Sequence, residues 1–368
     1  MKPGIKILAL FAMLSAVAHA EEPQSPSNAA STGFSGLLRG RDLTPFGYLR
    51  LDMMPASVMH LPTGASAVEA QFGYQNTWAM SDNVKQYLEQ RNTRTNLTAA
   101  DAAAIRSMPG EAYFVDMELG QLDLVWHYQI AEPLSAYLVT SAVHFGGGFM
   151  DAAIEDFHSA FGLGDADRPT VTRNQFNVIV NTKTSQATHL DGAGESKLLD
   201  PVAGLRYSAL APEASAQLIF ELATKIPVAG FRERASTGRF DVGAAVTGQY
   251  FGTFNAFYLN LAAVYHDHAD VMPLDVPSGI VPTAIAGWEH RLTNATSVVT
   301  QTYLSRSTYR ATDTELSELD RPKILVSVGM RQRMGPNTLT LGVTENLRSF
   351  NNTPDIAFEL GWTYTPGL

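Results

Sequence analysis

Apolar and polar residues alternate at every second position through most of this chain, and this period constrains the fold more than any other feature. The pattern is clearest near the C-terminus, where small or polar residues separate Ile356, Phe358, Leu360, Trp362 and Tyr364. A period of two is that of a β-strand with one apolar and one polar face. The chain is therefore predicted to be all-β.

About fourteen such segments of roughly ten residues follow one another. Their approximate ranges are 68–78, 113–119, 122–130, 135–145, 174–182, 205–209, 216–222, 240–246, 257–265, 284–292, 298–306, 324–330, 339–343 and 356–364. The connections between them alternate in length. Short turns are predicted near residues 120, 212, 250, 294 and 336, and longer polar loops over 79–110, 183–199, 227–238, 267–282, 307–321 and 348–353.

Strands of this length suit a tilted crossing of a bilayer, and alternating short and long connections are typical of outer-membrane barrels. Such barrels have an even number of strands, so about fourteen is acceptable and about twelve is the alternative. Aromatic residues near strand ends, including Trp78, Tyr265, Trp288 and Trp362, fit the girdles of a barrel at the two membrane interfaces. We predict a transmembrane, antiparallel, up-and-down β-barrel over residues 66–368, with one inserted amphipathic α-helix.

The first twenty residues resemble a cleaved export signal. Lys2 and Lys6 precede an apolar run over 7–17, and Ala18-His19-Ala20 is a small-x-small cleavage site. Cleavage would remove two lysines and no acid, which changes the formal net charge from −10 to −12. The expected location is the outer membrane of a Gram-negative bacterium. The lack of cysteine fits an exported protein, and the acidic balance argues against nucleic acid as a partner.

Residues 21–65 are rich in Ser, Ala, Pro and Gly and show no sustained alternation. We predict an N-terminal lead-in segment here, placed either in the periplasm or inside the barrel lumen.

The best helix candidate covers residues 149–161. Met150, Ile154, Phe157 and Phe161 recur at helical spacing, and Gly162 is a natural stop. With fourteen strands, this helix falls on the short-turn side of the barrel. We therefore expect it to plug the lumen or cap the periplasmic end, and so to gate passage.

Asp151, Glu155 and His158 share one face of that helix. A carboxylate beside a histidine could shuttle protons or hold a metal ion. The favoured interpretation is that the three side chains solvate the helix or pair with arginines of the lumen, because no further ligand is adjacent. No catalytic, cofactor-binding or metal-binding residue is predicted.

Charged residues on the polar strand faces are expected to line the lumen. Glu69, Asp116, Glu118 and Asp123 would form one acidic wall, and the inner surface elsewhere would carry Arg206, Arg291, Lys323 and Arg331. Two interpretations remain open. The charges either select solutes in an open channel or fill and close a narrow barrel with salt bridges.

The segment Asp151-x-x-Ile154-Glu155-x-Phe157-His158-x-x-Phe161-Gly162-Leu163, followed by Arg168, resembles the signature of an uncharacterised Gram-negative family, domain of unknown function 3187. Lys225-Ile226-Pro227 and Pro354-Asp355 before the last strand are similar too. The resemblance covers roughly residue 40 to the end. It implies an outer-membrane barrel and assigns no activity.

The sequence holds no nucleophile elbow, P-loop, zinc spacing or dinucleotide fingerprint, and no cofactor is expected. The favoured function is a passive channel or transporter for a small or amphipathic solute. The alternatives are a closed structural or partner-binding barrel and a membrane-embedded lipid hydrolase that uses His290 or His158. The expected partners are outer-membrane lipid, the barrel-assembly machinery during insertion and the solute.

Overall fold

The computed structural model describes residues 33–44, 47–55, 60–162, 167–182, 186–190, 194–212, 214–228, 234–271, 274–308, 319–348 and 352–366. The expected signal peptide, residues 1–20, lies outside the described residues.

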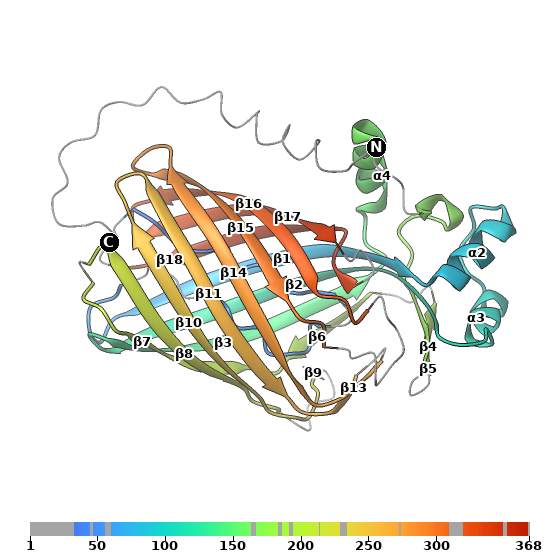
Figure 1. The fold of residues 1–368 in the computed structure, drawn as a ribbon, viewed down its shortest axis with the longest axis horizontal. Coiled ribbons are helices and arrows are strands. Elements are labelled where there is room, and N and C mark those ends of the chain that lie inside the picture. The colour runs from blue at the N-terminus through green and yellow to red at the C-terminus, as the bar shows by residue number, and fades with distance from the viewer. Residues whose placement is uncertain are drawn as a thin grey trace.

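A closed antiparallel barrel of twelve strands forms the body of the molecule (Figure 1). Each strand of the ring pairs with the strands that precede and follow it in the ring along the chain, and pairing of the first strand, β1, with the last, β18, closes the ring. The twelve are β1 (Ser66–Met80), β2 (Ala112–Ala131), β3 (Leu134–Gly146), β7 (Val202–Ser208), β8 (Ala216–Lys225), β10 (Asp241–Phe251), β11 (Asn255–His266), β14 (Gly279–Arg291), β15 (Thr296–Ser305), β16 (Lys323–Met334), β17 (Asn337–Arg348) and β18 (Ile356–Tyr364). The all-β barrel is thus confirmed, with the alternative count of twelve in place of fourteen.

The turn predicted near residue 120 is wrong. Gly120 lies within β2, paired with Tyr74 on one side and His144 on the other. A Cβ at this position would lie 3.0 Å from the Tyr74 ring, so the glycine makes room for an aromatic side chain on the neighbouring strand. The two segments predicted over 113–119 and 122–130 therefore form one strand.

The segment predicted over 174–182 is a strand but does not join the barrel ring. It forms β4 (Asn177–Asn181), which pairs with β2 at Ala112–Asp116, beyond the point where β3 ends. The remaining strands outside the ring are β5 (Gln186–Leu190), β6 (Glu195–Leu199), β9 (Arg234–Ala235), β12 (Ala269–Val271) and β13 (Leu274–Val276).

Three α-helices, rather than one, occur among the described residues. The predicted helix corresponds to α4 (Asp151–Phe161), which ends at Gly162 in the left-handed conformation. The other two are α2 (Asp82–Arg91) and α3 (Ala99–Arg106), inside a segment expected to be a polar loop. Thr98 and Asp101 form a reciprocal capping box that starts α3. None of the helices in the described part of the chain is long and apolar enough to cross a membrane.

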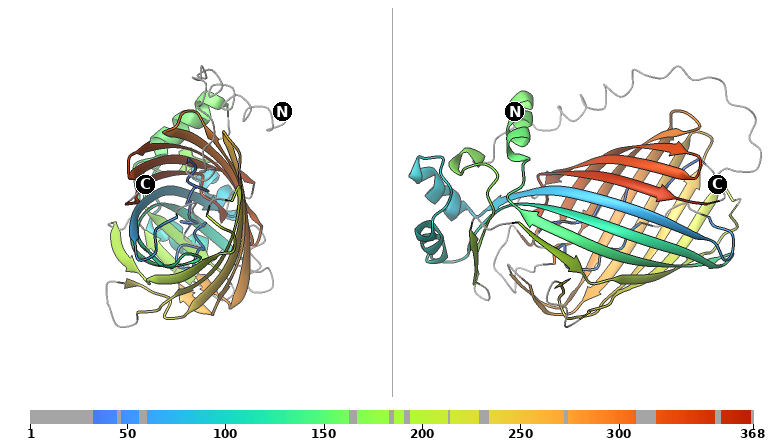
Figure 2. Two further views of the ribbon diagram at one scale, coloured as in Figure 1. Left: turned by 90° about the vertical axis from the view of Figure 1, so that its left-hand side faces the viewer. Right: turned by 180° about the vertical axis from the view of Figure 1, so that it is seen from behind.

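The helices lie at one end of the barrel, together with β4 and β5 (Figures 1 and 2). We call residues 77–117, 167–182 and 186–190 the headpiece. Its core contains buried side chains from both helices and from the ends of β1, β2 and β4. These core residues are Trp78, Met80, Val84, Leu88, Leu97, Ala102, Ile105, Ala112, Phe114, Val171 and Ile179.

The two ends of the barrel differ in their connections. The short-turn end holds the β2–β3 connection at 132–133, the turns near 212, 253, 294 and 335, the start of β1 and the end of β18. The long-loop end holds the headpiece and the longer connections. Because the turn near 120 does not exist, α4 belongs to the long-loop end, and its predicted place on the short-turn side is wrong.

Burial in the barrel is the reverse of that in a soluble protein. In β11, the side chains of Phe257, Leu259 and Leu261 point outward and are about half exposed, whereas Asn260 and His266 point inward and are buried. The other barrel strands repeat the pattern, with apolar residues outside and polar residues inside. The polar core therefore lies in the lumen.

Candidate functional site: the occupied lumen

Residues 33–44 and 47–55, which precede β1, lie inside the barrel. We call these residues the lumenal segment. Its apolar side chains Phe34, Leu37, Leu38, Leu43, Leu51, Met53 and Met54 are all buried, although the segment has no helix or strand. An irregular backbone can be buried only where its polar groups find partners, and the barrel wall supplies them.

Three ion pairs join residues 39–42 of this segment to three different strands of the barrel wall. Arg39 Nη1 lies 2.8 Å from Glu69 Oε2 on β1, and Arg41 Nε lies 2.8 Å from Asp123 Oδ2 on β2. Asp42 pairs with Lys323 Nζ at the start of β16. All six side chains are nearly or fully buried, so each charge needs its partner.

Backbone groups of the segment also bind side chains of the wall. Leu38 N donates to Gln301 Oε1 at 2.8 Å, and Arg331 Nη2 donates to Leu37 O at 2.8 Å. Glu289 accepts from Ser35 N and Gly36 N at 3.0 and 3.2 Å. Glu289 also accepts hydrogen bonds from Tyr258 and Ser297 of the wall and forms an ion pair with Arg331.

The segment crosses the lumen and then turns back. Phe34 packs on Phe251 near the short-turn end, with ring centroids 6.0 Å apart. A tight turn at 47–50 follows near the long-loop end, where Lys225 Nζ lies 2.8 Å from both Leu49 O and Asp241 Oδ2. The chain comes back to the short-turn end at Gly64, whose N–H donates to Gln129 O. Two passes of the chain therefore occupy much of the lumen.

A buried apolar cluster lies at the long-loop end of the lumen. It contains Leu43 of the lumenal segment and Leu319 from the β15–β16 connection, together with strand residues of β1, β2, β3, β4 and β6. Those strand residues are Ala79, Tyr113, Val115, Met117, Leu119, Val143, Val178, Val180 and Leu199, and Phe176 precedes β4. Tyr48 and Leu49 pack against the cluster.

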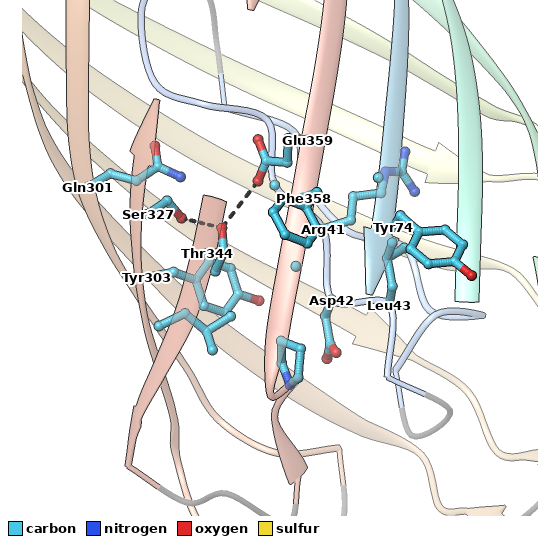
Figure 3. Close-up of a pocket in the computed structure, with 15 residues that line it drawn as sticks. Arg41, Asp42, Leu43, Tyr74, Gln301, Tyr303, Ser327, Thr344, Phe358 and Glu359 are labelled. Carbon is cyan, nitrogen blue, oxygen red and sulfur yellow. Dashed lines mark hydrogen bonds between the residues drawn. The ribbon is translucent and has the colours of Figure 1, made fainter. Parts of the chain in front are cut away.

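Small voids remain beside the lumenal segment (Figure 3). Two cavities of about 20 Å³ each share Gly40, Arg41, Leu43, Gly73 and Glu359 in their linings. This volume holds about one water molecule. A cavity of about 150 Å³ at the short-turn end is lined by side chains that include His60, His127, Gln129, Ser135, Arg206 and Ser208.

Of the predicted lumen residues, Glu69, Asp123, Arg206 and Arg331 are buried on the inner face. Arg206 Nε donates to Glu221 Oε2 at 2.7 Å. Lys323 is also buried inside, and Arg291 lies over the Phe34 ring at 4.7 Å.

Asp116 and Glu118 do not line the lumen. They share their strand parity with Leu122, Leu124 and Trp126, whose exposed side chains point outward. The prediction fails because it placed a turn at 120; in one continuous strand, Asp116 and Glu118 face opposite to Asp123.

Arg168 organises a polar cluster on this outer face. Its Nη1 donates to Asp151 Oδ1, and its Nη2 donates to Asn76 Oδ1 and Asp355 Oδ2, each at 2.7 Å. The guanidinium also stacks on Trp78, 5.0 Å from the ring centroid. Asp151 and Arg168 belong to one motif of the sequence and Asp355 to another, and the fold brings the three residues into contact.

The three predicted polar residues of α4 do not form one site. His158 Nε2 lies 4.0 Å from Asp355 Oδ1, on the buried side of the helix with Asp151. Glu155 pairs with Arg94 and Arg173 of the headpiece. Burial alone would raise the pKa of Glu155, but hydrogen bonds from Arg173 and Arg94 lower it below its usual range. These contacts fasten α4 to the outer wall and the headpiece, so α4 does not plug the lumen.

His290 lies near the short-turn end on the outer face. Its Nδ1 is 2.9 Å from Asn255 Oδ1, and its ring is 5.5 Å from that of Trp288. In the described ranges, no three His, Asp or Glu side chains gather in a geometry suited to a metal ion.

The sequence left the place of the lumenal segment open between the periplasm and the lumen. A signal was present, because Arg39-Gly40-Arg41-Asp42 is a charged run inside an otherwise Ser-, Gly- and Leu-rich stretch. Its partners Asp241 and Glu289 were visible only as polar members of alternating strands.

The fold defines this class of protein: a twelve-stranded up-and-down barrel whose lumen holds residues 33–44 and 47–55 of the same chain. The chain belongs to the family described as Protein of unknown function (DUF3187), whose sequence model matches residues 87–365.

The fold is similar to that of the COG4313 outer membrane channel from Pseudomonas putida F1, with a TM-score of 0.51 and 11% identity. That match covers 85% of this chain and 99% of the other. The NanC porin matches with a TM-score of 0.42 and 8% identity, over 81% of this chain and 99% of the porin. No curated protein matches the sequence significantly.

Proposed function

We propose that this protein is a channel or transporter of the Gram-negative outer membrane that passes a small or amphipathic solute. Its lumenal segment closes the pathway and must shift for the solute to pass. The observation that carries the proposal is the lumenal segment itself, held across a polar lumen by ion pairs and surrounded by voids of water size.

The outer surface of the barrel supports placement in a membrane. Exposed apolar side chains cover the outward face of every barrel strand except where the headpiece and α4 lie. Exposed aromatic residues gather near the short-turn end, as expected for an interfacial girdle. They are Trp126, Tyr207, Tyr250, Phe257, Trp288, Trp362 and Tyr364. Outer-membrane barrels keep their short turns, and the first and last residues of the barrel-forming chain, on the periplasmic side. This orientation would place the headpiece outside the cell.

The way in which the lumenal segment is held suits a closing element that moves. It has no strand pairing with the wall, so its release breaks no ladder of the barrel. Its ion pairs join side chains that water could solvate once the lumen opens. The likeness to an outer membrane channel concerns the fold and agrees with a transport role. Gating is assigned to the lumenal segment and not to α4.

The test is ion conductance in planar bilayers. A release variant with Arg39→Gln, Arg41→Gln and Asp42→Asn removes the three charges of the lumenal segment that pair with the wall. We expect it to open at least about tenfold more often than the unmodified protein, because each buried pair is worth more than about 1 kcal/mol. A matched variant, Arg94→Gln with Arg173→Gln, removes two headpiece charges and is expected to conduct like the unmodified protein.

Folding of each variant is checked by the mobility shift of unheated samples on a denaturing gel. A folded release variant that opens no more often than the unmodified protein would show that the lumenal segment is not the closing element. Absence of conductance in every variant would favour the closed structural barrel instead.

A further inference from the structure

Helix α4 projects sideways from the barrel wall instead of covering the mouth. Its axis runs across the barrel axis, and it stands outside the ring of strands in both Figures 1 and 2. In a barrel that spans a membrane, a helix in this orientation lies parallel to the membrane plane.

The side of α4 that faces away from the protein carries an apolar stripe. Phe149, Ala153, Phe157 and Ala160 are all exposed and recur at intervals of four, four and three residues, which places them on one helix face. Phe149 is 71% exposed and Phe157 is 36% exposed. The side toward the protein holds the buried Met150 and Ile154 together with Asp151 and His158. Helix α4 therefore has two apolar surfaces: a buried one with Met150 and Ile154, and this exposed stripe.

This stripe continues the outward apolar surface of the barrel. On β1, the rings of Phe72 and Tyr74 stack with centroids 6.2 Å apart, and Phe149 stacks on Tyr74 at 5.1 Å. The column of rings passes from the middle of the wall to the start of α4. Directly beyond it, Asn76 and Glu118 begin the polar cluster around Arg168, and Glu118 accepts hydrogen bonds from the backbone N–H groups of Phe149 and Met150. The change from apolar to polar marks the level at which a bilayer would end.

We propose that α4 is an interfacial helix that lies in the outer-leaflet boundary, with Phe149, Ala153, Phe157 and Ala160 against lipid acyl chains. The proposal rests on the membrane placement proposed above. An amphipathic helix at this depth buries its apolar face among the upper acyl chains and keeps its polar face at the headgroups. Asp156, three residues after Ala153 and four before Ala160, borders the stripe directly, and Ser159 lies beyond it on the same edge. Both are exposed and would face headgroups and water.

The contacts around Arg168 hold α4 at this level. Asp151 anchors the first turn of the helix through Arg168, and Glu155 is held by Arg94 and Arg173 from the headpiece side. The motif over 151–168 thereby acquires a role. It sets the depth at which the barrel and its headpiece meet the lipid.

The experiment is fluorescence quenching by lipids that carry a spin label. The chain has no cysteine, so single cysteines can be labelled with a small fluorophore at chosen positions. The variants are Phe149→Cys and Phe157→Cys on the stripe, Ser159→Cys on the polar edge of the same helix, Leu122→Cys on the barrel wall and Glu89→Cys on α2. Each labelled protein is placed in phosphatidylcholine vesicles with the spin label near either the carbonyl end or the methyl end of the acyl chain.

We expect labels at positions 149 and 157 to be quenched most by the label near the carbonyl end, and the label at 122 most by the label near the methyl end. Labels at 159 and 89 should lose little fluorescence. Quenching at 122 without quenching at 149 and 157 would overturn the interfacial helix and leave the membrane barrel standing. No quenching at 122 would overturn the membrane placement and this inference with it. The mobility shift on a denaturing gel confirms that each variant is folded.

Discussion

Strands β1 and β2 each run through two parts of the molecule, the barrel and the headpiece. Polar side chains are buried in the first and apolar side chains in the second. In the barrel part, from Ser66 to Gln75 of β1 and from Gly120 to Tyr128 of β2, apolar side chains are exposed outside and polar side chains are buried inside. Beyond Asn76 and Glu118, both faces are buried and the core is apolar, as in a soluble domain. The same alternation therefore serves two surroundings.

Under the membrane placement proposed above, this difference marks the level at which the surroundings of the strands change from lipid to water. In the barrel, the lumenal segment satisfies buried charges by pairing them with the wall. In the headpiece, the buried charges gather around Arg168, between α4 and the outer face of the strands. The buried charges of the lumen and those around Arg168 form separate groups. A substitution in one group is therefore expected to leave the other region folded.

The largest effect is expected from Arg168→Gln. Arg168 is 2% exposed, and its loss leaves the carboxylates of Asp151 and Asp355 without their cation. Breaking a buried pair of this kind costs about 3–5 kcal/mol. Hydrogen exchange should rise in α4 and the headpiece but not in the barrel strands. The exposed Arg106→Gln on α3 is the control, and unchanged exchange at α4 in the Arg168 variant would contradict the assignment.

A smaller cost is expected from Leu122→Arg in the barrel part of β2. Leu122 is 41% exposed and lies midway between Trp126 and Glu118. Arginine on the lipid face near the bilayer centre destabilises a barrel by about 2–4 kcal/mol. The same change at an exposed site in water is usually within about 0.5 kcal/mol. Urea unfolding in vesicles measures the difference, with Gln90→Arg on α2 as the control. Equal stability of both variants would argue against the membrane.

Next in size is Glu289→Gln in the lumen. Glu289 is fully buried and accepts the N–H groups of Ser35 and Gly36. The amide keeps the shape but loses the charge and one acceptor, at a cost of about 1–3 kcal/mol. Exchange should rise at residues 33–38 while the strands stay protected, with the exposed Asp156→Asn as the control. If residues 33–38 stay as protected as in the unmodified protein, Glu289 does not hold this part of the lumenal segment.

The smallest effect concerns the pH response of Glu155. Its hydrogen bonds to Arg173 and Arg94 lower its pKa, so the contribution of these pairs is fully present above the usual glutamate range near pH 4 and is lost as pH falls through the lowered pKa. Hydrogen exchange of α4 should therefore rise a few-fold on acidification below about pH 4. Glu155→Gln should abolish this pH response; a response that persists in Glu155→Gln would contradict it.

The alternating pattern was enough to predict the barrel, because a period of two is set by each strand alone. The strand count was not, since Gly120 looks like a turn residue until Tyr74 on the neighbouring strand is seen to occupy its space. That one error moved α4 to the wrong end and placed Asp116 and Glu118 on the wrong face.

The lumenal segment could not be placed from the sequence for a different reason. Its order comes from partners such as Glu69, Gln301 and Lys323, which lie far along the chain and on different strands. Residues 82–91 and 99–106 were missed as helices because a polar stretch hid their short apolar faces, although the Thr98–Asp101 capping box was readable.

The central claim is that the lumenal segment closes the barrel, and a reversible tether tests it most directly. A Cβ at Gly73 would lie 3.0 Å from Leu43 Cδ1, so Leu43→Cys with Gly73→Cys places two thiols next to each other on the segment and on β1, and loss of free thiol on oxidation verifies the disulfide. The pair is introduced into the release variant, in which no other cysteine competes. We predict that oxidation lowers conductance to the level of the unmodified protein and that reduction restores it, with the single-cysteine variants unaffected. Equal conductance in the oxidised and reduced states would contradict the claim.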